Sequence, residues 1–210
     1  MGIYRNICYK VEDAFVKFLT KGKDPEEIRK KVEAYRKEKE QERLRKKEEA
    51  EKRIAEQKRL QEEKKEIERQ EVLALLSQVV DVDNKGYTQY EFNEVKNNKN
   101  FFQSLIQRVF EQNEKGLTFI YCEFDKSSKK EIKGYLIATN KRVLFVNKSL
   151  TFMDKFRYQT IINVNWFADG ILERGLLIQY GKRRLEFDEM YDSEQMKRLG
   201  NVILNMASNK

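Results

Sequence analysis

The amino-acid sequence predicts an α+β protein. A long charged N-terminal helix, single or in a coiled coil, precedes a seven-stranded, partly open β-barrel with a C-terminal capping helix. Residues 26–71 contain no glycine and no proline, and their 17 Lys and Arg residues are nearly balanced by 15 Glu residues. Roughly the last hundred residues hold seven short segments rich in β-branched and aromatic residues. After Asp188 the apolar period changes from that of a strand to that of a helix.

Residues 1–22 have an amphipathic pattern that predicts a docking or oligomerisation helix. Five apolar residues at helical spacing form a stripe that we expect to cover a second surface: Ile3, Ile7, Val11, Phe15 and Phe18. Three partners for the stripe remain open at this point: the chain's own helix or a sister copy, a different protein, or a membrane interface, which Phe15 and Phe18 beside Lys17 would suit. We expect a sister copy, and therefore a homo-oligomer, most simply a dimer.

Residues 24–80 are predicted to form one long helix. An Asp-Pro pair opens it, and acid–base pairs such as Glu42–Lys46 lie four residues apart. At ~1.5 Å per residue this helix would be roughly 80 Å long. The apolar residues in its middle fit no heptad, which argues against a continuous coiled-coil seam: Tyr35, Leu44 and Ile54. A spacer, or a helix that pairs only near its ends, is the resulting interpretation.

Residues 81–115 are predicted to form a helical connector to the barrel. The long helix ends in an apolar run, residues 72–80, which must be buried against something. A D-x-D-x-x-G spacing that begins at Asp81 is similar to a calcium loop, but Lys85 stands where an oxygen ligand belongs and Phe92 stands where a bidentate Glu belongs. We therefore predict a polar turn rather than a calcium site.

Residues 116–210 are predicted to form the globular domain. Turn signals such as Gly181-Lys182 separate seven expected strands. The strands are expected at Leu117–Phe124, Glu131–Thr139, Arg142–Asn147, Thr151–Tyr158, Ile162–Phe167, Gly175–Tyr180 and Arg184–Phe187. A final amphipathic helix, capped by Asp192 or Ser193 and with Leu199 on its inner face, is expected to plug one end of the barrel.

The composition argues against an enzyme. The chain has no histidine and only two cysteines, Cys8 and Cys122, so ordinary zinc sites and both Ser-His-Asp and Cys-His catalysis are excluded. We predict no catalytic residue, no metal and no cofactor. The cysteines are expected to be free thiols in a reducing cytosol. No signal peptide and no transmembrane helix is expected, so the predicted location is cytoplasmic, with a peripheral membrane location as the alternative.

Two segments resemble a known family. Gly134–Val146, which contains Thr139-Asn140-Lys141-Arg142, resembles the Thr-Asn-x-Arg-hydrophobic hairpin of bacterial pleckstrin-homology-like (PH-like) domains, the YokE-like group in particular. Phe156–Val164 resembles the basic-Tyr-x-x-Ile-x-x-Val strand of that group. The resemblance covers roughly residues 97–207. It implies a PH-like barrel and a binding role, and nothing in the family motif is catalytic.

The same resemblance implies two surfaces that could bind a partner. Eukaryotic relatives hold inositol phosphates with basic residues near the loop between the first two strands, and this chain has basic residues there and on its last hairpin. The candidates for anion binding are Lys126, Lys129, Lys130, Lys141, Arg142, Lys182, Arg183 and Arg184. Solvated basic loops are the alternative. The second surface is the groove between the closing helix and the sheet edge, where some relatives add a peptide strand.

Together these features favour a non-enzymatic cytosolic binding or scaffold protein. Its PH-like domain would recognise a protein partner of unknown identity, and its helical N-terminal segments would serve assembly. The alternative is a peripheral membrane protein that binds anionic lipid through the N-terminal helix and the basic loops. A nucleic-acid-associated protein is a third hypothesis, since the net charge is +8. Nucleic acid is the least expected of these partners because neighbouring Glu residues neutralise the basic residues of the long helix.

Overall fold

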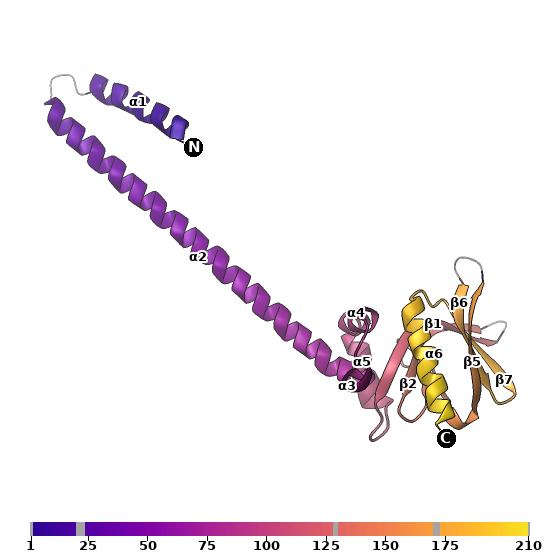
Figure 1. Cartoon of the computed structure of the whole chain (residues 1–210). Helices are drawn as coiled ribbons and strands as arrows, with labels where there is room; N and C mark the ends of the chain where they lie inside the picture. The colour runs from indigo at the N-terminus through magenta and orange to yellow at the C-terminus, as the bar shows by residue number, and fades with distance from the viewer. Residues whose placement is uncertain (1, 20–23, 128–129, 170–172, 210) are drawn as a thin grey trace. The chain divides into compact units, whose positions relative to one another are not determined.

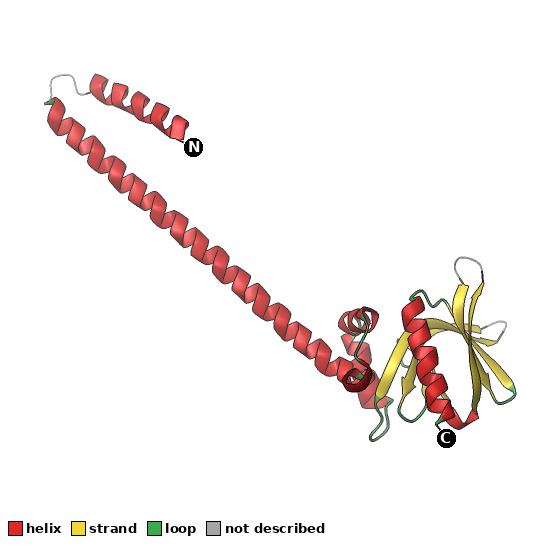
Figure 2. Ribbon diagram, viewed as in Figure 1, coloured by secondary structure: helices red, strands yellow, loops and turns green. Residues whose placement is uncertain are grey.

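The chain forms two compact units, Met1–Lys64 and Lys65–Lys210 (Figures 1 and 2). The computed structural model describes residues 2–19, 24–127, 130–169 and 173–209. One helix, α2, begins in the first unit and ends in the second.

The N-terminal unit contains α1 (Gly2–Leu19) and most of α2 (Pro25–Val79). The 55 residues of α2 confirm the predicted long helix. Local interactions explain where it begins: the Asp24 carboxylate accepts a hydrogen bond from the Glu26 amide at 3.1 Å. The predicted Glu42–Lys46 pair is present, with 2.6 Å between Oε1 and Nζ.

The C-terminal unit opens with three short helices, α3 (Val82–Lys85), α4 (Gln89–Asn97) and α5 (Lys99–Arg108). A capping box begins α4, because the Thr88 side chain accepts from the Glu91 amide and the Glu91 carboxylate accepts from the Thr88 amide. The predicted polar turn at Asp81 contains the single turn of α3. There the Asp81 carboxylate accepts from the Asn84 side chain at 2.9 Å.

All seven predicted strands are present. They are β1 (Gly116–Ser127), β2 (Lys130–Thr139), β3 (Val143–Asn147), β4 (Met153–Phe156), β5 (Ile161–Asp169), β6 (Glu173–Tyr180) and β7 (Arg183–Asp188). The fourth strand ends two residues earlier than predicted. The chain turns into a 3-10 helix, η1 (Tyr158–Thr160), where the Tyr158 hydroxyl donates to the Thr139 carbonyl at 2.6 Å.

The strands form one antiparallel sheet in the order β4-β3-β2-β1-β7-β6-β5. Its two edge strands, β4 and β5, do not pair, so the sheet is curled but not closed. The closing helix α6 (Ser193–Ser208) packs against β5, β1 and η1 (Figure 1). Seven strands in one curled, unclosed sheet followed by a closing helix are the fold that the sequence predicted.

The inner core lies between the curled sheet and α6. The α6 cap is Asp192, one of the two predicted residues, whose carboxylate accepts from the Gln195 amide at 2.9 Å. Leu199 and Ile203 of α6 are fully buried against strand residues such as Phe187. Hence Leu199 has the inward position that the apolar period predicted.

A second core lies on the other face of the sheet. The end of α2 gathers there with α4 and α5 over β1, β2 and β3 (Figure 1). Phe102 of α5 packs on Phe119 and Tyr135, with ring centroids 4.8 and 5.3 Å apart. Gly116 of β1 allows the end of α2 to come close to the sheet, because a Cβ at that position would lie 2.2 Å from the Val79 carbonyl oxygen. The predicted connector, residues 81–115, thus lies in the same compact unit as the sheet.

Candidate functional site

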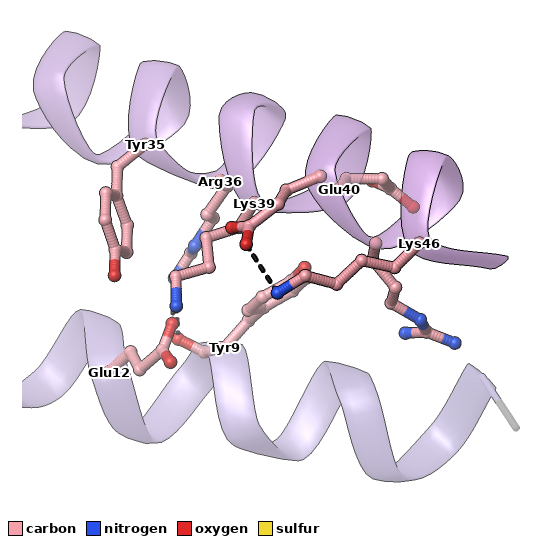
Figure 3. A pocket seen from close by; sticks show the side chains of 9 residues that line it. Tyr9, Glu12, Tyr35, Arg36, Lys39, Glu40 and Lys46 are labelled. Carbon is pink, nitrogen blue, oxygen red and sulfur yellow. Dashed lines mark hydrogen bonds and ion pairs between the residues drawn. The ribbon is translucent and has the colours of Figure 1, made fainter. Parts of the chain in front are cut away.

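One face of α1 is fixed on α2 by Arg36. The Arg36 guanidinium donates to the Tyr9 carbonyl and to the Asp13 carboxylate, both at 3.0 Å, and lies 3.7 Å from the Glu12 carboxylate. It also stacks over the Tyr9 ring, 4.4 Å from the ring centroid. Figure 3 shows Arg36 reaching from α2 toward Tyr9 and Glu12 on α1. The contact between the two helices is therefore largely polar.

Two hollows border this contact. The first has a volume of about 510 Å³ and is charged (Figure 3). Its lining residues are Tyr9, Glu12, Tyr35, Arg36, Lys39, Glu40, Glu42, Arg43 and Lys46. Within it, the hydrogen bond and charge of Lys46 lower the pKa of Glu42, and Glu42 raises the pKa of Lys46. The second hollow, of about 500 Å³, is more apolar and includes Val16, Ile28 and Val32.

The predicted assembly stripe is exposed. Ile7, Val11, Phe15 and Phe18 have exposed fractions of 55%, 64%, 62% and 68%. The fifth stripe residue, Ile3, lies in α1, but its side chain is outside the part of the structure that is described. The residues that contact Arg36 lie elsewhere on α1, and the packing of α1 on α2 leaves the four described stripe residues exposed.

The predicted anion-binding residues fall into three groups. Lys129 and the side chains of Lys126 and Lys130 lie outside the described part of the chain. Lys182, Arg183 and Arg184 are exposed on the β6–β7 hairpin, and Arg183 stacks over the Tyr180 ring at 5.3 Å.

Lys141 and Arg142 form the third group, and both bind the chain's own acceptors. Arg142 is buried and its guanidinium donates to Glu114 at 2.8 and 3.0 Å. It also pairs with Glu111, while Lys141 donates to the Gln112 carbonyl at 2.6 Å. The pKa of Glu114 is lowered, because hydrogen bonds from the Glu111 amide, Arg142 and Thr139 outweigh the opposing effect of burial. Arg142 is therefore a structural ion-pair residue, and its charge is used within the fold.

An acidic cluster that the sequence analysis missed lies where β1, β2 and β7 meet. The carboxylate oxygens of Glu123, Asp125 and Glu131 lie within 4.8 Å of one another. Burial, helped by the charges of Asp125 and Glu123, raises the pKa of Asp188 from 3.8 to about 6. One carboxylate oxygen of Asp125 and one of Asp188 are buried without a hydrogen-bond partner among the described residues.

Lys133 partly neutralises this cluster. Its ammonium group lies 3.1 Å from Glu123 and 2.5 Å from Glu189, and the hydrogen bonds to Glu189 and Glu123 raise the pKa of Lys133. A hydrogen bond with Glu123 raises the pKa of Glu131. Carboxylate oxygens are the ligands that hard cations prefer, so Glu123, Asp125 and Glu131 are the described residues best placed to hold one. Their spacing along the sequence gives no signal, because they come together only through strand pairing.

The only tryptophan of the chain, Trp166, lies on the edge strand β5 beside α6. Its indole lies against Gly200 of α6: a Cβ on Gly200 would be 2.7 Å from the ring. Trp166 remains 38% exposed. Its ring therefore packs on α6 at the sheet edge, the second of the two surfaces that the resemblance implies.

Comparison with protein-family models finds no match, and comparison with curated proteins finds none either. Solved structures do resemble the chain. The C-terminal domain of an unknown protein from Leishmania infantum is 12% identical, with 52% of this chain and 96% of that chain covered and a TM-score of 0.42. The Vps36 N-terminal PH domain is 12% identical, with 48% and 84% covered and a TM-score of 0.39. The PH domain of USP37 is 14% identical, with 44% and 98% covered and a TM-score of 0.35.

These likenesses concern the fold alone. Among the helices that the structure describes, none combines the length and the apolar composition needed to cross a bilayer.

Proposed function

We propose that this protein is a non-enzymatic binding and scaffold protein. Its PH-like unit recognises a protein partner, and its N-terminal unit assembles with a second copy of the chain. The observation that supports assembly is the position of the stripe. Arg36 holds one face of α1 on α2, while Ile7, Val11, Phe15 and Phe18 stay more than half exposed.

The hydrophobic effect supplies the driving force for this assembly. Burying one Phe or Ile side chain contributes roughly 1.5–3 kcal/mol. A helical hairpin has no second layer to cover such a face, whereas two hairpins can bury their stripes against each other. A second copy is the simplest source of a matching face, so the expected assembly is a symmetric dimer.

On the PH-like unit, the surface best suited to a partner is the β6–β7 hairpin. Lys182, Arg183 and Arg184 are exposed there, and no ion pair involves them within the described residues. An acidic segment of a partner protein would be complementary to them. The cytoplasm, where both free cysteines would stay reduced, is the proposed location.

Light scattering of the intact chain at micromolar concentration tests this proposal. We expect the mass of a dimer for the parent and of a monomer for Phe15→Glu/Phe18→Glu, because the new charges cannot be buried. The matched control is Ala50→Glu/Gln57→Glu, which adds two acids on exposed positions of α2. A monomeric parent chain would contradict the proposal.

A further inference from the structure

Both acidic residues of α1 lie at its contact with α2, and two exposed lysines lie nearer the stripe. The helix has two acidic residues, Glu12 and Asp13, and both lie within 4 Å of Arg36, at 3.7 and 3.0 Å. The other charged residues of α1 are all basic: Arg5, Lys10 and Lys17. Arg36 of α2 therefore pairs with both acids of α1, and α1 itself carries three basic against two acidic residues.

Two of these basic residues lie beside the stripe. With ~3.6 residues per turn, Lys10 and Lys17 fall on the same edge of the helix, between Ile7 of the stripe and Asp13. Both lysines are exposed. A lysine at such an edge can lay its methylene groups along an apolar surface and keep its ammonium group in a polar layer.

The wider N-terminal unit has the same sign of charge. Residues 2–46 contain fourteen Lys and Arg against nine Asp and Glu. This excess favours an anionic surface over a second copy, which carries the same charge, wherever such a surface is present. An exposed apolar stripe with lysines along its edge is the pattern of a helix that lies in a membrane interface.

We infer that an anionic lipid bilayer takes the place of the second copy on the stripe. This inference rests on the proposed function, in which the dimer is the form that covers the stripe in the absence of lipid. On a bilayer, Ile7, Val11, Phe15 and Phe18 enter the boundary between headgroups and acyl chains, and Lys10 and Lys17 contact lipid phosphates. The PH-like unit is thereby recruited to the membrane surface.

Vesicle flotation of the full-length chain tests the inference. We expect the parent to float with vesicles that contain phosphatidylglycerol and to stay in solution with phosphatidylcholine alone. Lys10→Gln/Lys17→Gln should weaken flotation by about 30-fold, since each basic residue near the surface contributes a factor of about five. The same variant should dimerise at least as well as the parent, because it removes like charges from the edge of the stripe.

Two further variants complete the test. Phe15→Glu/Phe18→Glu should abolish both flotation and dimerisation. Lys58→Gln/Lys64→Gln removes the same charge from exposed positions in the middle of α2 and should change neither. A dimeric parent that does not float overturns this inference and leaves the proposed dimer standing. A parent that is monomeric without lipid contradicts the proposed function, and equal flotation with both kinds of vesicle overturns the role of the lysines.

Discussion

Gln195 of α6 donates a hydrogen bond to Glu91 of α4 at 3.0 Å, across 104 positions of the chain. The same Glu91 carboxylate accepts from the Thr118 hydroxyl of β1 at 2.6 Å, and both Glu91 and Gln195 are fully buried. One polar network thus joins the helical layer on the outer face of the sheet to the closing helix on its inner face.

Glu91→Ala should destabilise the C-terminal unit by about 3 kcal/mol, because it leaves the Thr118 hydroxyl and the Thr88 amide without their acceptor in a buried site. Urea denaturation followed by circular dichroism measures the effect. Glu194→Ala is the control, since Glu194 is an exposed acid at the start of α6. Equal midpoints for the two variants would show that the network contributes nothing.

Gly200→Ala should move the Trp166 ring. The new Cβ would lie 2.7 Å from the indole, closer than atoms of this kind approach each other. We expect overpacking to lower the free energy of unfolding by about 1–3 kcal/mol, which outweighs the gain of about 1 kcal/mol from the higher helix propensity of alanine. Trp166 is the only tryptophan, so its fluorescence maximum should shift to longer wavelength. Asn201→Ala, on the exposed side of α6, should leave the emission unchanged.

Asp188 should make the stability of the protein depend on pH near pH 6. Its pKa is raised from 3.8 to about 6 in the folded state, so the folded form binds a proton that the unfolded form has already lost. Stability should therefore fall as the pH rises from about 4 to above 6. Asp188→Asn removes this loss and should be more stable than the parent at pH 8, with a difference that shrinks below pH 4. Thermal melts of the parent and the variant between pH 4 and pH 8 measure this difference in stability. A difference that does not change with pH would mean that Asp188 does not titrate in this range.

A peptide of residues 24–71 should be substantially helical in isolation. Its stabilising interactions are local, such as the Lys46–Glu42 ion pair and the Asp24 cap. Circular dichroism at low salt and low temperature measures its helix content. Added salt should lower that content, because exposed ion pairs are screened. A random-coil spectrum would contradict the interpretation of α2 as an autonomous helix.

The C-terminal unit should need the end of α2. Val72, Leu76 and Val79 are fully buried in the outer core. A fragment of residues 65–210 should fold. A fragment that begins at residue 97 exposes the outer core, and its free energy of unfolding should be lower by several kcal/mol. Comparing the denaturation midpoints of the two fragments tests this. Equal midpoints would mean that the helical layer adds no stability to the sheet.

The sequence predicts those elements whose cause is local. Propensity and ion pairs define α2, alternation and turn residues define the strands, and the change of period after Asp188 defines α6. The outer helical layer is not predicted in the same way. The sign of this layer is that β2 is apolar on both faces. Its neighbouring residues Tyr135 and Leu136 point to opposite faces and are both fully buried, which is typical of a sheet that is covered on both sides.

The candidate site is only partly predictable. The stripe follows from helical periodicity, but the contact of Arg36 with Asp13 joins residues 23 positions apart through a helical hairpin. The acidic cluster likewise depends on strand register, which pairs Asp125 with Glu131 and places Asp188 opposite Glu123. No local pattern marks these contacts, since they are set by tertiary structure.

The burial of β2 and β3 on both faces has a consequence for how the unit unfolds. Leu136 and Phe145 belong to the inner core, while their neighbours Tyr135 and Leu144 belong to the outer core. Neither core can be exposed to water without separating strands that the other core also needs. The two cores are therefore expected to melt in a single cooperative transition, and the amides of this hairpin should exchange with solvent only when the whole unit opens.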